Sequence, residues 1–118
     1  MATFRLLDDA VEIDLSLADE ILSLHGRLRI PYGHIEAVAA DPVPQEWFRG
    51  VRMGTNLPGL KVAGSFLTPD GVRFFDFHDP NRCVTLSLRH DRYVQVTVEV
   101  DAGQDATAVA RSIQDRLA

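Results

Sequence analysis

The fold is decided by residues 93–117, which read YVQVTVEVDAGQDATAVARSIQDRL. In the first part of this stretch, Tyr93–Val100, valine occupies alternate positions: Val94, Val96, Val98 and Val100. Gln95, Thr97 and Glu99 stand between the valines. Because side chains alternate between the two faces of a strand, this pattern predicts a strand with one apolar and one polar face.

After Val100 the apolar residues recur at helical spacing. Asp105 near the start and Arg116 near the end suit the dipole of a helix. The residues that we expect the helix to bury are Val109, Ala110, Ile113 and Leu117. The sequence therefore predicts a C-terminal helix packed over the valine face of the preceding strand, in a contact that stabilises the domain.

Outward from this stretch, alternating patterns and turn signals predict further strands. Thr68-Pro69-Asp70-Gly71 suits a type I turn, and Asp79-Pro80-Asn81 is a second turn signal. The expected strands are Ala10–Leu15, Arg27–Ile30, Val62–Leu67, Val72–Phe77, Cys83–Leu88 and Tyr93–Val100. Ile35–Ala40 is a further short apolar run, which ends at Asp41-Pro42. Short turns between the later strands predict an antiparallel meander. Leu17–Leu24 is compatible with either a strand or a helical turn.

Residues 41–61 are expected to be the least regular part of the chain. Their prolines and glycines exclude long regular elements and leave room for a short strand near Val51–Met53. Trp47 and Phe48 are apolar anchors there, either in the core or at an exposed edge.

The composition predicts one globular domain over residues 1–118. Apolar residues make up 46% and charged residues 25% of the 118, near the averages for such domains. Cys83 is the one cysteine, so no internal disulfide forms, and we expect it to be a small buried hydrophobe. The N-terminus has no secretory signal pattern and no apolar stretch is long enough for a membrane helix, so we expect a cytoplasmic protein.

The charge lies at the N-terminal end. Residues 1–20 hold one basic and six acidic residues, which accounts for the whole net charge of −5. We expect most of this acidity to keep an exposed edge strand soluble. An acidic chain without a basic stripe is a poor binder of nucleic acid or of anionic lipid.

Particular strings carry a family resemblance: Ile30-Pro31-Tyr32-Gly33-His34-Ile35, the stretch Arg52–Gly59, and Gly64-Ser65-Phe66. With the closing strand and helix, they make the chain similar to bacterial pleckstrin-homology-like (PH-like) domains over nearly its whole length. The resemblance implies a mainly β fold, a partly open antiparallel barrel of about seven strands capped by a C-terminal α-helix, and it implies no activity. Where phosphoinositide-binding members carry Lys and Arg, Leu15–Glu20 reads LSLADE and would repel a phosphorylated headgroup.

Candidate chemistry is sparse. His78-Asp79 and His90-Asp91 repeat a pattern, and Asp76 is expected to share a strand face with His78, which together suggest metal ligands. No pair has the spacing of a zinc site, and both pairs stand at turns, so the expected metal set is empty. The serines and Cys83 lack the surroundings of a nucleophile.

The glycines of Gly50–Gly59, with Arg49, Arg52 and Lys61 around them, suggest a phosphate-cradling loop. No Gly-Lys-Ser/Thr follows them, so turn geometry explains the glycines better, although the cations can form an anion-tolerant patch.

These observations predict a non-catalytic binding or scaffold module without a cofactor. We expect it to bind a protein partner, or a second copy of itself, through a strand edge or the groove beside the C-terminal helix. The candidate binding residues are Trp47, Phe48, Arg49, Arg52 and Lys61. One alternative is a small-molecule or anion-binding domain, enzymatic or not, that uses the barrel mouth and the Arg49–Lys61 loop. The other is a weak peripheral membrane binder.

Overall fold

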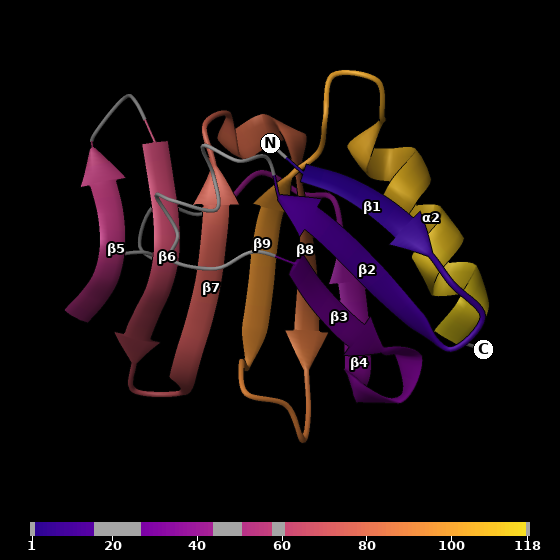
Figure 1. The fold of residues 1–118 in the computed structure, drawn as a ribbon, viewed down its shortest axis with the longest axis horizontal. Helices are drawn as coiled ribbons and strands as arrows, with labels where there is room; N and C mark the ends of the chain where they lie inside the picture. The colour runs from indigo at the N-terminus through magenta and orange to yellow at the C-terminus, as the bar shows by residue number, and fades with distance from the viewer. Residues whose placement is uncertain (1, 16–26, 44–50, 58–60, 118) are drawn as a thin grey trace.

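The computed structural model describes residues 2–15, 27–43, 51–57 and 61–117, and of residues 51–57 and 61 it describes the backbone only. Nine strands, two short 3-10 helices and one α-helix are found in these ranges (Figure 1). Along the chain they are β1 (Ala2–Leu6), β2 (Ala10–Leu15), β3 (Arg27–Pro31), η1 (Tyr32–His34), β4 (Ile35–Ala39), β5 (Val51–Leu57), β6 (Lys61–Thr68), β7 (Gly71–Phe77), η3 (Pro80–Arg82), β8 (Cys83–Leu88), β9 (Gln95–Glu99) and α2 (Ala106–Leu117).

The strands form two sheets. One has the order β1-β2-β3 and is antiparallel throughout, and the other has the order β4-β8-β9-β7-β6-β5. Figure 1 shows the three-stranded sheet crossing in front of the larger sheet, with α2 beside it. The prediction of a mainly β fold with a C-terminal helix is confirmed, although the described strands number nine rather than about seven.

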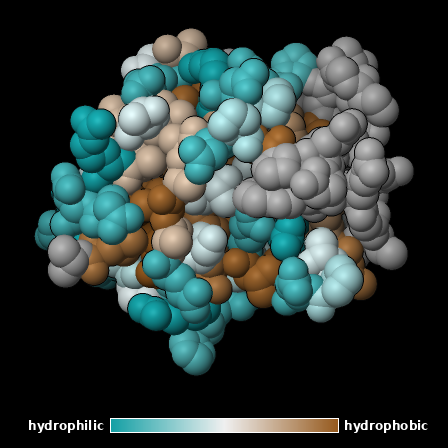
Figure 2. Space-filling model, turned by 180° about the vertical axis from the view of Figure 1, so that it is seen from behind, coloured by the Kyte–Doolittle hydropathy of each residue, from teal (hydrophilic) through white to brown (hydrophobic). Residues whose placement is uncertain are grey.

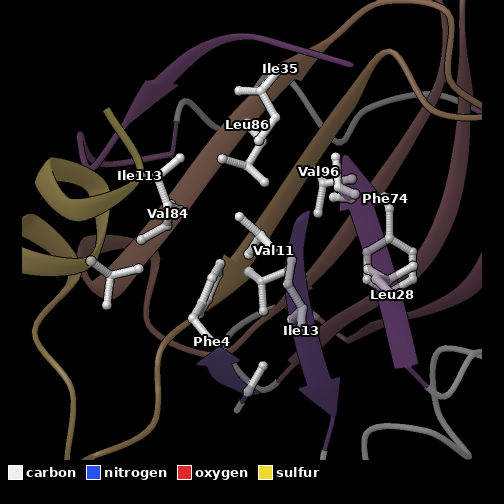
Figure 3. Close-up of a cluster of buried hydrophobic side chains, with 14 of the residues drawn as sticks. Phe4, Val11, Ile13, Leu28, Ile35, Phe74, Val84, Leu86, Val96 and Ile113 are labelled. Atoms are coloured by element: carbon white, nitrogen blue, oxygen red, sulfur yellow. The ribbon is translucent and has the colours of Figure 1, made fainter. Parts of the chain in front are cut away.

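The main core fills the space between the two sheets. Val96, Val98 and Val100 are buried in it, as the alternation predicts. The three-stranded sheet contributes Phe4, Val11, Ile13, Leu28 and Ile30, and the larger sheet adds Phe74, Val84 and Leu86 (Figure 3).

A second apolar cluster lies on the other face of the large sheet. Phe74 belongs to the main core and its neighbour Phe75 to this second cluster, because successive residues of a strand point to opposite faces. Phe75 packs edge to face against Phe66, with ring centroids 5.2 Å apart. The remaining members are Val43, Val62, Phe77 and Cys83, and the burial of Cys83 is confirmed.

The polar residues of the last strand lie on the face opposite the valines, as predicted, but this face is buried. Gln95, Thr97 and Glu99 are buried, since β9 lies in the middle of the large sheet, where side chains on both faces are covered. The Glu99 carboxylate compensates its burial by accepting hydrogen bonds from the backbone N–H groups of His78 (2.7 Å) and Asp79 (2.9 Å).

The predicted antiparallel meander is wrong at one point, because β7 and β8 follow one another in the chain but are not neighbours in the sheet. β9 lies between β7 and β8, antiparallel to β8 and parallel to β7. An alternating pattern is the same in both kinds of pair, so it does not select the partner. β1 was not expected at all, and β5 is longer than the short strand expected within residues 41–61.

The helix is where the sequence predicts it. Val109, Ala110 and Ile113 are buried and Leu117 is partly buried against the main core. Asp105 caps its first turn, with Oδ2 accepting from the N–H of Ala108 at 2.9 Å. The neighbours of the helix are more specific than the sequence predicts: α2 lies closest to β4, β8 and η1, and its buried residues Val109 and Ile113 share the main core with the valines of β9.

Replacement of Ile113 by alanine tests how much the helix contributes to the core. Ile113 is fully buried, so Ile113→Ala should lower the free energy of unfolding by about 2–5 kcal/mol through lost burial and a cavity. Ser112→Ala, an exposed neighbour, should change it by no more than about 0.5 kcal/mol. Urea denaturation followed by circular dichroism measures both. Equal effects of the two variants would show that the helix does not contribute to the core as described.

Candidate functional site

The candidate binding residues from the sequence lie outside the described side chains. Trp47, Phe48 and Arg49 fall in residues 44–50, which the structure does not describe. Arg52 and Lys61 have a described backbone only, on β5 opposite Phe66 and on β6 opposite Leu57. A basic binding patch in the Arg49–Lys61 loop therefore stays a prediction.

The histidine and aspartate pairs are not brought together. Asp76 is fully buried on β7, whereas His78 is exposed just beyond the end of that strand, so the two side chains lie in different environments. His34 Nδ1 lies 3.0 Å from Asp91 Oδ2, which links η1 to the loop between β8 and β9. Among the described residues, no group of three or more His, Cys, Asp or Glu side chains is arranged to hold a metal ion.

The outer face of the three-stranded sheet carries a ladder of ion pairs. Arg5 on β1 lies 3.2 Å from Glu12 on β2, and Arg27 on β3 pairs with Asp14 on β2. Arg29, also on β3, lies 3.8 Å from Glu12. Glu12 and Asp14 thus stand on the central strand between arginines of both neighbours, and for these two residues the expectation of an edge strand is wrong.

This ladder bears on membrane binding. Arg27 and Arg29 are the nearest basic residues to the acidic Leu15–Glu20 stretch, and both are engaged: Arg27 with Asp14, and Arg29 with Asp9 at 2.8 Å. Cations already paired with carboxylates offer little attraction to an anionic lipid surface. No helix in the described ranges has the length and apolarity to cross a membrane.

The free edge of β1 forms hydrogen bonds with Asp101 and Gln104, which lie just before α2. Phe4 N–H donates to Gln104 Oε1 at 3.0 Å, and Gln104 Nε2 donates to the Phe4 carbonyl at 3.2 Å. The carbonyl of Ala2 accepts from the N–H of Asp101 at 2.9 Å. The Gln104 amide therefore occupies the place of a neighbouring strand, which is one way that proteins prevent edge-to-edge association.

The edge of β4 is different. Leu88 N–H donates to Val94 O at 2.9 Å, so Leu88 faces β9, and by alternation so does Leu86. Leu86 is paired with Val38 on β4, and the N–H and C=O of Val38 therefore point away from β8, toward the free edge. Among the residues that the structure describes, neither a strand nor a side chain bonds to them.

Two hollows flank this edge, one on each face of the sheet. The back hollow, of about 230 Å³, is lined by Ala37, Val38, Ala39, Asp41, Pro42, Thr85 and Ser87. The helix-side hollow, of about 320 Å³, is lined by Val38, Ala39, Ala40, Asp41, Thr107, Ala110, Arg111 and Gln114. Figure 2 shows the molecule from behind. On the half of the surface opposite the grey atoms, apolar residues in brown lie among hydrophilic residues in teal.

The β4 edge with its two hollows is the candidate site. The sequence predicts a strand edge or helix groove in general terms, but it does not single out β4, Gln104 or Arg111. The one feature of the sequence that points to β4 is the row of four small apolar residues, Ala37–Ala40, within the apolar run Ile35–Ala40.

Comparisons with known proteins give no information on this site. No family model matches the chain, and searches of curated proteins and of solved structures returned no significant match.

Replacement of Gln104 by alanine tests the protection of the β1 edge. Gln104→Ala removes both bonds to Phe4 and should lower the free energy of unfolding by about 1–2 kcal/mol. It should also increase aggregation on heating, measured by light scattering, because the exposed edge becomes a pairing surface. Gln114→Ala is the matched control, since Gln114 is an exposed glutamine of α2, and it should change neither property. Unchanged stability in Gln104→Ala would contradict the assignment.

Proposed function

We propose that this domain is a non-catalytic binding module that captures an extended polypeptide segment as an additional strand on the edge of β4. The observation that carries the proposal is the outward-pointing N–H and C=O of Val38, which have no partner within the described residues. An incoming strand supplies one acceptor and one donor to this residue, and affinity follows from such main-chain bonds.

The two hollows support the same function. Side chains of an extended segment point alternately to the two faces of a sheet. A segment on β4 would therefore send successive side chains into the back hollow and the helix-side hollow in turn, and Val38, Ala39 and Asp41 line both. Main-chain pairing along an edge with side-chain hollows on both faces is the combination by which strand addition gains specificity.

The two edges are treated differently, which also favours this function. The β1 edge is occupied by Gln104 and Asp101, whereas the β4 edge presents short side chains such as Ala37 and Ala39. Short side chains allow a second backbone to approach. We therefore place the interaction on β4 and not on β1.

The alternatives have less support. A groove of about 630 Å³ between β1 and α2 is open to solvent, and Leu6, Gln104 and Val109 are among its lining residues. It offers no cluster of cations for an anionic small molecule, because Arg116 is its one basic lining residue and donates to the carbonyl of Leu7. The membrane alternative is opposed by the paired arginines of the ion-pair ladder.

We retain the PH-like assignment as part of this proposal. Two sheets with a C-terminal helix over one end of the core are compatible with it. The resemblance of the strings around Ile30–Ile35 and Gly64–Phe66 is its other support.

A random dodecapeptide phage library, panned against the wild-type protein, tests strand addition. Peptides recovered in this way should lose at least tenfold in affinity, about 1.4 kcal/mol, on Ala37→Lys, measured by fluorescence polarisation. Ala37 is exposed on β4, so lysine fits without disturbing the core, and an edge lysine opposes pairing. Ala108→Lys makes the same change in the β1–α2 groove and should leave affinity unchanged.

Amide chemical shifts locate the bound peptide. On titration of the recovered peptide, we expect the largest changes at Val38 and its neighbours on β4. Largest changes along β1 and at Gln104 and Asp105, equal loss in both lysine variants, or a library without binders would each overturn the proposal.

A further inference from the structure

Arg111 stands apart from the other described arginines. It is exposed on α2 and lines the helix-side hollow. Each other arginine whose side chain is described has an ion pair, a hydrogen bond or a ring contact; these are Arg5, Arg27, Arg29, Arg73, Arg82, Arg89, Arg92 and Arg116. Within the described part of the chain Arg111 has none of these. A guanidinium beside an open strand edge is available to a ligand.

The register of an added strand determines which ligand residue meets Arg111. The Val38 side chain lies on the core side of the sheet, where it packs against the main core and pairs with Leu86. In an antiparallel pair, residues directly opposite one another have side chains on the same face. The ligand residue opposite Val38 therefore points into the helix-side hollow, toward Arg111 and Gln114.

We infer that the helix-side hollow selects a carboxylate side chain at the ligand position opposite Val38, with Arg111 as its partner. This inference rests on the proposed strand addition and names the class of ligand: an extended segment with an acidic residue at its centre. A guanidinium fork matches a carboxylate in two parallel hydrogen bonds, and Gln114 can add a further donor.

The neighbouring ligand positions have different requirements. Residues opposite Ala37 and Ala39 point into the back hollow, where Thr85 and Ser87 supply the only described side-chain hydroxyls. A hollow of about 230 Å³ with mostly small neutral walls fits a short β-branched side chain. The expected core of the ligand is therefore an acidic residue between two residues such as valine.

Asp41 limits the acidity of the ligand. It is exposed, lies three positions beyond Val38 along the chain, and lines both hollows. No ion pair joins it to Arg111. A carboxylate placed opposite Asp41 would be repelled, so one acidic residue, and not an acidic run, is the expected signature.

Three synthetic dodecapeptides with blocked ends and a fluorescent label test the inference. They differ only at the centre, which reads Val-Glu-Val, Val-Gln-Val or Val-Lys-Val. We expect the wild-type protein to bind the Glu peptide at least fivefold more tightly than the Lys peptide by fluorescence polarisation. The net charge of −5 on its own would favour the Lys peptide, so this order reports a local contact.

Charge reversal distinguishes the local contact from a general effect. Arg111→Glu should reverse the order and bind the Lys peptide more tightly. Arg116→Glu makes the same charge change on the same helix, in the β1–α2 groove, and should keep the wild-type order. Thermal denaturation checks that both variants are folded, since both residues are exposed.

The remaining outcomes separate this inference from the proposed function. Equal binding of the three peptides, or tighter binding of the Lys peptide by wild type, overturns carboxylate selection and leaves strand addition in place. Binding of none of them overturns both. Sedimentation velocity tests whether the edge binds a second copy of the chain. A dimer that is lost in Ala37→Lys and persists in the presence of the Glu peptide would show that the occupant is a second copy, and would overturn the inference.

Discussion

The structure depends on the position of β9 in the middle of the large sheet. Its backbone pairs antiparallel with β8 and parallel with β7, and its side chains are buried on both faces. The valines join the two sheets in one core, while Thr97 bonds to Thr85 and Glu99 bonds to the backbone of the β7–β8 connection. Because β9 joins β8 to β7, the β4 edge and the β5 edge belong to one sheet.

The location of the candidate site follows from which edges this arrangement leaves open. β8 takes its two neighbours on opposite sides, β9 and β4, and β4 is then the last strand on that side of the sheet. The helix lies along β4 and β8 and forms one wall of the hollow beside the edge. On the smaller sheet, Gln104 comes from the segment just before this helix and bonds to β1. One C-terminal segment therefore closes one edge and shapes the other.

The distribution of charge agrees with this division of the surface. Asp9, Glu12 and Asp14 are engaged with Arg5, Arg27 and Arg29 across the small sheet. Surface pairs of this kind add little stability singly, but each of these three arginines has a carboxylate partner. Arg111, by contrast, has no partner among the described residues and stands beside the open edge. A ligand bound at this edge, as we propose, would meet the local charge of Arg111 rather than the net charge of the chain.

Patterns in the amino-acid sequence are enough to predict the local elements: the strands Ala10–Leu15 and Cys83–Leu88, the buried valines, and the helix face of Val109 and Ile113. Alternation, helical spacing and capping act between residues close in the chain, so these features are readable from one sequence. Strand order, the parallel β7–β9 pair, the burial of Glu99 and the open edge of β4 were decided by the tertiary structure alone. These features depend on which distant strands become neighbours. The alternation of apolar and polar residues along a strand is the same for every choice of partner, so it does not specify the neighbours.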